Sequence, residues 1–226
     1  MTSRHDITAT LPWMREGTEH LLRVADKIDD VTAPSRLPGW THAHVLGHVA
    51  RNAEALTRLA TWARTGVETS MYADSGQRAA EIEASARKPA ATLRAELAST
   101  ADTLDEALDA LTPQQWNAPV RSALGRAIPA AEIPWMRIRE VWLHAVDLGA
   151  DFGLPDGVVD LLLDDVTTAL SRKDGCPAAT LTPTDRDTTW QLGGGGPAIE
   201  APAAELAGWL TGRLHRADWP ALPTWL

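Results

Sequence analysis

A glutamate and a histidine four residues apart, Glu140 and His144, are the residues of this chain that most directly suggest chemistry. On a helix this spacing brings both side chains to one face, one turn apart. A carboxylate oxygen and an imidazole nitrogen arranged in this way can bind a single metal ion such as zinc. A catalytic zinc site usually has three protein ligands and one open position, so another part of the chain must supply the third ligand.

The best candidate for the third ligand is His48, which lies in the apolar segment Val45-Leu-Gly-His-Val49. Glu140 and His144 have similar neighbours, since residues 133–149 are rich in Trp, Val and Leu. Buried ionisable groups are costly unless they are paired or bind a metal. The three residues together therefore favour a metal site, although the Glu/His spacing alone also fits a surface pair or an ordinary buried histidine. His44 is a rival ligand, but it lies in the first turn of its expected helix, where residues are usually more exposed.

Composition narrows the class of protein. The chain has 226 residues, 44% of them hydrophobic, which permits one large domain or a medium domain with a small partner. The formal net charge of −9 argues against a nucleic-acid partner, because such proteins usually carry a basic face. No apolar run approaches the roughly 20 residues that a membrane helix needs, and Met1 to Asp6 lead into no apolar signal segment.

The chain contains a single cysteine, Cys176, between Gly175 and Pro177. One cysteine excludes an intramolecular disulfide framework and fits a reducing compartment, so we expect a cytoplasmic protein. We interpret Cys176 as an ordinary loop residue and not as a nucleophile.

Apolar residues recur at helical spacing through the first 173 residues. The pattern predicts helices over residues 8–28, 41–66, 76–88, 90–111, 130–148 and 156–172. Residues 112–129 contain several prolines and are expected to be irregular. The predicted fold class is mostly α, with a helical bundle over residues 1–173.

The pattern changes after Lys173. Residues 179–182, 188–192 and 198–200 predict short strands, and residues 202–212 a short helix. The run Gly193–Gly196 lacks the Lys-Ser/Thr of a phosphate-binding loop, so we interpret it as a hairpin turn. Residues 174–226 are therefore expected to form a small α+β domain.

Several motifs together resemble a known family. They are Gly39-Trp-Thr41 before His48, Met71-Tyr72 with Arg78-Ala-Ala-Glu-Ile82, the segment 135–150, and Gly212-Arg213 with the terminal Pro-Thr-Trp-Leu. This set resembles the mycothiol-dependent maleylpyruvate isomerases, within the DinB-like superfamily of metal-binding helix bundles. The resemblance implies a DinB-like four-helix bundle with a small C-terminal α+β domain. It is strongest over residues 36–82 and 129–150, and residues 174–200 depart from the family pattern.

The resemblance implies roles for five residues. His48, Glu140 and His144 would bind a divalent metal, Zn2+, and Arg78 and Arg213 would contact the substrate or the thiol. Taken without the family, Arg78 reads as a solvated helix residue and Arg213 as a charge near a helix end. Arg216 lies close enough in sequence to rival Arg213.

The implied reaction is the cis–trans isomerisation of maleylpyruvate to fumarylpyruvate, a step of gentisate breakdown. The nucleophile would be the thiol of the cofactor mycothiol, which adds to the double bond and leaves after rotation. The partners are then mycothiol and a small-molecule dicarboxylate, with no nucleic acid and no membrane, and we expect a monomer. Arg137 and Arg139 flank the metal-binding segment and are interpreted as structural or surface residues.

Two other functions fit the same residues. The bundle could instead conjugate mycothiol to an electrophile as an S-transferase in detoxification or natural-product biosynthesis. It could also be a non-enzymatic zinc-binding regulatory module with a closed metal site. The closed site would need a fourth ligand, for which His44, His20 and Asp147 are available. Asp147 could instead orient the imidazole of His144.

Overall fold

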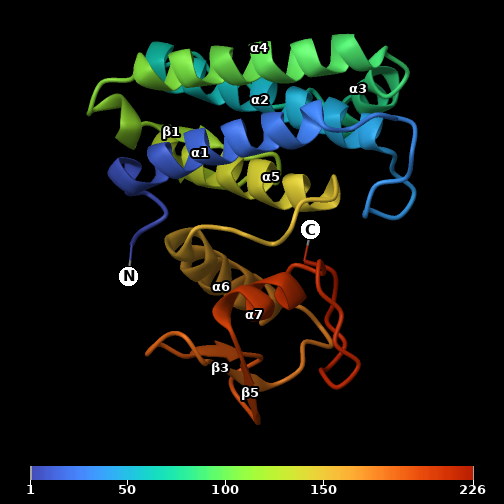
Figure 1. Ribbon diagram of the computed structural model, residues 1–226. Helices are drawn as coiled ribbons and strands as arrows, with labels where there is room; N and C mark the ends of the chain where they lie inside the picture. Colours follow the sequence, from blue (N-terminus) through green and yellow to red (C-terminus); the bar gives the residue numbers. More distant parts are fainter. Residues whose placement is uncertain (1, 226) are drawn as a thin grey trace. The chain divides into compact units, whose positions relative to one another are not determined.

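Contacts divide the chain after Ala150 in the computed structural model, which describes residues 2–225 (Figure 1). One unit spans Arg4–Ala150 and is mostly helical, and the other begins at Asp151 and combines helices with a small sheet. This confirms the mostly α fold class with an α+β C-terminal part. The expected boundary after residue 173 differs from the observed one, because α6 (Asp156–Leu170) packs on α7 (Ala203–Leu210) and belongs to the second unit.

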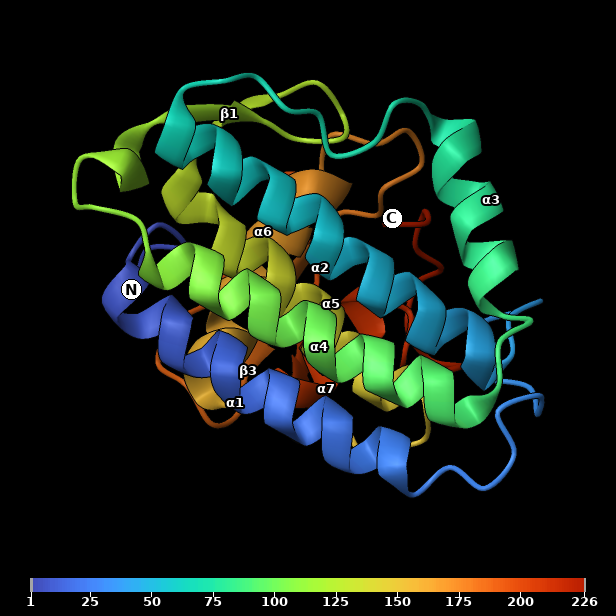
Figure 2. The same cartoon turned by 90° about the horizontal axis from the view of Figure 1, so that it is seen from above.

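The bundle of the first unit consists of α1 (Ile7–Asp26), α2 (His42–Thr65), α4 (Ala90–Asp109) and α5 (Ile133–Asp147). Figure 2 shows these helices lying alongside one another, with α3 (Ser75–Ser85) beside one end of α2. The most extensive contacts are those of α2 with α4 and of α1 with α5. The largest fully buried apolar side chains of this core are Leu21, Leu46, Leu56, Leu59, Leu93, Leu97, Leu104, Leu108, Ile133, Trp135 and Ile138.

The sequence sets both ends of α2, the helix that carries His48. Thr41 is the N-cap and forms a capping box with His44. The backbone N–H of each residue donates a hydrogen bond to the side chain of the other. Gly66 ends the helix with a φ of 73°, a left-handed conformation that glycine adopts without a steric penalty. Both ends agree with the helix predicted over residues 41–66.

Residues 112–129 are more regular than expected. They contain a 3-10 turn (Gln115–Asn117) and an antiparallel pair, β1 (Pro119–Arg121) and β2 (Ala127–Pro129), followed by a second 3-10 turn (Ala130–Glu132) before α5. The two strands have three residues each and contain proline, so the sequence lacks the longer alternation by which strands are predicted.

The second unit contains α6, β3 (Ala179–Pro183), β4 (Trp190–Leu192), β5 (Ala198–Ala201) and α7. Its sheet has the order β4-β3-β5, with β3 antiparallel to β4 and parallel to β5. The glycine run is therefore not a hairpin turn, since β4 and β5 pair with β3 and not with each other. The run crosses the start of β3, where a Cβ on Gly193 or Gly196 would lie 2.5 Å from a carbonyl oxygen of Pro177 or Ala178.

Among residues 2–225, no helix combines the length and the apolar composition that are required to cross a membrane.

Candidate metal centre

Three side chains from two helices of the bundle converge on one point. His48 comes from α2, and Glu140 and His144 come from consecutive turns of α5. Glu140 Oε2 lies 2.8 Å from His48 Nε2 and 3.2 Å from His144 Nε2, and the three candidate ligand atoms all lie within 4.8 Å of one another. The His48 side chain is 5% exposed, whereas those of His144 and Glu140 are 12% and 23% exposed, so the group is mostly buried but retains some contact with solvent.

The donor set and its spacing fit a divalent metal. Tetrahedral zinc with bonds of 2.0–2.2 Å places its ligand atoms ~3.4 Å apart, close to the two distances measured to Glu140 Oε2. Two imidazoles with one carboxylate form a known catalytic zinc ligand set, which leaves a fourth position open. Within the described part of the chain, the group that could hold a metal contains these three residues only.

Asp147 holds the ring of His144 from the other side. Its Oδ2 lies 2.8 Å from His144 Nδ1, and the carboxylate is 1% exposed. Metal-binding histidines usually donate their second ring N–H to a carboxylate or carbonyl, which fixes the tautomer and directs the other nitrogen to the metal. Asp147 is thus placed to orient the His144 ring, and it does not belong to the group of converging ligand atoms.

The second nitrogen of His48 faces α3. Nδ1 lies 3.4 Å from Nη2 of Arg78, and the ring of Trp40 meets the imidazole edge-on with centroids 5.4 Å apart. α3 can approach α2 closely because residue 47 is a glycine, where an added Cβ would lie only 2.5 Å from Cβ of Ser85. The glycine before His48 thus brings Arg78 to the candidate metal centre.

A family model described as the mycothiol maleylpyruvate isomerase N-terminal domain matches residues 14–149, which include all three candidate ligands. The chain belongs to this family. It is 33% identical to a solved structure described as the mycothiol-dependent maleylpyruvate isomerase, with a TM-score of 0.92 and 100% of both chains covered. A histidine-to-alanine mutant of the mycothiol-dependent maleylpyruvate isomerase, also solved, is 32% identical with the same TM-score and coverage. No curated protein sequence matches the chain.

In this member of the maleylpyruvate isomerase family, the pKa values of the three candidate ligands are shifted by different causes. Burial lowers the pKa of His48 and so favours the neutral form of its ring. Burial raises the pKa of Glu140, but the charge interactions and hydrogen bonds with His48 and His144 outweigh this effect and hold the pKa well below its ordinary value. For His144, burial lowers the pKa, but the hydrogen bonds to Asp147 and Glu140 raise it by more, so the net shift is upward.

These shifts make His144 the residue at which protons compete with a metal. A ligand must be deprotonated to bind, so we expect metal affinity to fall as pH decreases through the raised pKa of His144, by about one proton per site. Titration with Co2+ between pH 5 and 8 measures this dependence. In Asp147→Asn the carboxylate that raises the pKa is gone, so the loss should begin at lower pH. A dependence on two protons, or an unchanged midpoint in Asp147→Asn, would contradict this assignment.

The other histidines considered as ligands have different partners. His44 Nδ1 lies 2.7 Å from Thr41 Oγ1 in the capping box, and its Nε2 lies 3.5 Å from Glu83. His20 stacks on Trp142, with ring centroids 5.3 Å apart. Neither belongs to the converging group, so within residues 2–225 no histidine completes a closed four-ligand site.

The two arginines at the end of α7 differ in their contacts. Arg216 is bound by Glu205 at 3.0 Å and by Asp218 at 3.3 Å, and its guanidinium lies 4.8 Å above the ring of Trp219. Two carboxylates thus neutralise its charge. Arg213 is half-buried, and its Nη1 donates to the carbonyl oxygen of Thr211 at 2.7 Å. The paired charge makes Arg216 the weaker candidate for a contact with an anionic ligand.

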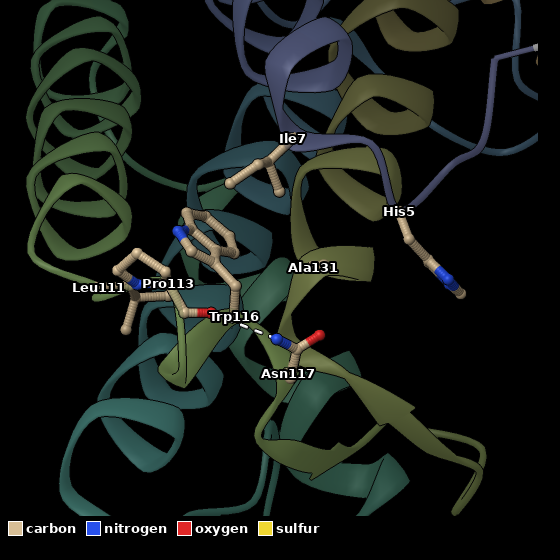
Figure 3. A pocket seen from close by; sticks show the side chains of 7 residues that line it. All are labelled: His5, Ile7, Leu111, Pro113, Trp116, Asn117 and Ala131. Carbon is tan, nitrogen blue, oxygen red and sulfur yellow. Dashed lines mark hydrogen bonds between the residues drawn. The ribbon is translucent and has the colours of Figure 1, made fainter.

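A separate hollow of about 310 Å³ lies beside Trp116, and Figure 3 shows the indole next to Ile7, Pro113 and Leu111. Asn117 lines the same hollow, but its amide donates to the carbonyl oxygen of Pro113 at 3.2 Å. The hollow contains none of the converging ligands and offers mainly apolar contacts.

Arg137 is the buried one of the two alternatives that the sequence left open, a structural or a surface residue. Its guanidinium is 1% exposed and lies between α5 and α2. The only sequence signal was its position three residues before Glu140, on the same helix face. Tyr72, next to Met71 in the family motif, is a residue to which the sequence assigned no role. Burial raises the pKa of its phenol by more than the nearby Arg78 lowers it, so the net shift is upward.

Proposed function

We propose that this chain isomerises maleylpyruvate to fumarylpyruvate, with mycothiol as the thiol cofactor and a zinc ion bound by His48, Glu140 and His144. The observation that carries the proposal is the convergence of two imidazoles and one carboxylate, two of which are partly exposed. Similarity over the full chain to a structure described as the mycothiol-dependent maleylpyruvate isomerase supports the choice of reaction. The single cysteine supports a reducing, cytoplasmic compartment, and gentisate breakdown is the metabolic setting that this reaction implies.

A metal held by these residues would lower the pKa of a bound thiol. The thiolate would add to one carbon of the cis double bond, the resulting carbon–carbon single bond would rotate, and expulsion of the thiolate would restore the double bond as trans. The protein residues set the charge for this chemistry. Two neutral imidazoles and one carboxylate neutralise only one charge of a divalent ion, so the centre remains positive and favours an anionic thiolate. Asp147 keeps His144 in the tautomer whose Nε2 lone pair points inward.

Arg78 and Arg213 are proposed to hold the carboxylates of the substrate. The protein carries a net charge of −9, so a dicarboxylate needs a local cation in order to bind. Arg78 Nη2 lies within 3.4 Å of a candidate metal ligand, which suits it to the negative charge that develops on the substrate near the thiol. Arginine binds carboxylates by two parallel hydrogen bonds, which fixes orientation as well as charge.

The test follows the ultraviolet absorbance of maleylpyruvate mixed with the protein, Zn2+ and mycothiol. We expect turnover that requires the thiol and that falls by more than about 1,000-fold in His48→Ala, because the metal and with it the activated nucleophile are lost. His44→Ala is the matched control, since it removes a histidine one turn away on α2 that caps the helix.

The outcomes separate the candidate functions. No isomerisation, with mycothiol still consumed by an alkylating electrophile, would replace the isomerase by an S-transferase with the same metal centre. Protein that binds no metal after purification without chelator would refute both enzymatic proposals. Equal loss of activity in His44→Ala and His48→Ala would indicate damage to α2 instead of loss of a ligand.

A further inference from the structure

Arg137 is a charged side chain that is enclosed by the core of the bundle. It lies on α5 and is 1% exposed. Its Nη1 donates to the carbonyl oxygen of Val49 at 2.7 Å and to Oδ1 of Asn52 at 2.9 Å, both on α2. Nε and Nη2 have no hydrogen-bond partner within residues 2–225.

Stability of the bundle does not account for such a residue. Burial lowers the pKa of Arg137 to about 10, so the guanidinium remains charged at neutral pH. Both of its acceptors are neutral, and a buried charge without full pairing costs free energy that an apolar side chain of similar volume would avoid. We therefore look for a role of this arginine other than packing.

The location of the two hydrogen bonds indicates that purpose. Val49 follows His48 directly, and Asn52 lies one turn further along α2. On α5, Arg137 lies one turn before Glu140, and the buried charge interacts with that carboxylate. The bridge thus joins the turn that carries one candidate ligand to the helix that carries the other two. Because metal–ligand distances must be correct to within about 0.2 Å, the register between α2 and α5 decides whether the three ligands can share one ion.

We propose that Arg137 is a positioning residue of the metal centre, which fixes α2 against α5 so that His48 meets Glu140 and His144. This inference rests on the metal centre of the proposed function but is independent of which thiol-dependent reaction the enzyme catalyses.

The test compares Arg137→Met with Arg94→Met. Arg94 is the matched control, because it also joins two helices through backbone carbonyls, donating from α4 to Ala25 and Ile28 at the end of α1. Co2+ is titrated into each metal-free protein, and its visible absorption reports both affinity and ligand geometry. We expect Co2+ affinity to fall about 10- to 100-fold in Arg137→Met, with a changed spectrum, and to stay unchanged in Arg94→Met.

Thermal unfolding of the same metal-free proteins separates positioning from packing. A lower midpoint in Arg137→Met with unchanged Co2+ affinity and spectrum would overturn the proposal, because a purely structural residue gives that result. If Arg137→Met does not fold, Asn52→Ala replaces it, since this change removes one of the two acceptors. A fall in Co2+ affinity of at least about twofold is then expected, and no fall would overturn the proposal. Wild-type protein that fails to bind Co2+ would instead refute the metal centre itself.

Discussion

The Glu140→Gln variant is expected to lose metal binding and thiol-dependent turnover together. Glutamine keeps the size of the side chain but replaces the single anionic ligand by a neutral amide, which binds zinc poorly. Changes to residues outside the ligand set typically weaken metal affinity 10- to 100-fold, so loss of a ligand should cost at least about 100-fold. Metal content after dialysis, Co2+ titration and the maleylpyruvate assay measure the two effects on one preparation.

The matched control for this variant is Glu83→Gln. Glu83 also faces a histidine, His44, at 3.5 Å, but it lies outside the converging group and is exposed. The Glu83→Gln variant should bind Co2+ and turn over substrate as the wild type does. Wild-type metal affinity in Glu140→Gln would show that Glu140 is only the hydrogen-bond partner of two histidines, and the metal proposal would fail.

The stability of the metal-free protein provides a second readout for Glu140. Its pKa in the folded protein lies well below the ordinary value, so the ionised carboxylate stabilises the fold at neutral pH. That contribution is lost as pH falls through the depressed pKa. The Glu140→Gln variant lacks this contribution at every pH. The difference in thermal midpoint between the wild type and Glu140→Gln should therefore be largest near pH 7 and shrink in acid.

The candidate ligands could be predicted from sequence because two of them share one helix. A spacing of four residues determines that Glu140 and His144 point the same way, whatever surrounds the helix. His48 is 92 residues from Glu140 in sequence, and no local rule places it there. Its apolar neighbours predicted burial, and the family resemblance supplied the pairing. The three side chains meet in the structure because α2 packs against α5, and local sequence does not specify that contact.

The features that were missed depend on such packing. The domain boundary was expected after residue 173 because α6 has the amphipathic pattern of a bundle helix, and that pattern does not say which partner covers its apolar face. The sequence left open whether Arg137 is structural or lies at the surface, because arginine is seldom buried and only packing shows that this one is. The glycine run was interpreted by the commonest use of glycine between strands, whereas the order β4-β3-β5 requires it to cross a strand end. In each case the local sequence predicts what the segment is, and its role depends on the part of the fold that it packs against.

Removing the proposed carboxylate-binding arginines should raise the KM for maleylpyruvate without weakening metal binding. A hydrogen bond to a charged group contributes about 1.5–3 kcal/mol, so Arg78→Met and Arg213→Met should each lower kcat/KM by about 10- to 100-fold. Arg87→Met and Arg216→Met are the controls. Arg87 is exposed at the end of α3, and Arg216 is already neutralised by Glu205 and Asp218.

The lysine variant distinguishes charge from geometry at the same position. Arg78→Lys keeps a positive charge but cannot form two parallel hydrogen bonds to a carboxylate, so it should restore only part of the lost kcat/KM. Co2+ affinity should be no lower than in the wild type in the variants of Arg78, Arg87, Arg213 and Arg216, because none of these side chains is a ligand and the loss of a positive charge does not disfavour a bound cation. Equal losses in Arg213→Met and Arg216→Met would remove the assignment of Arg213. Wild-type KM in Arg78→Met would mean that the dicarboxylate is held by other residues, even though Arg78 lies beside His48.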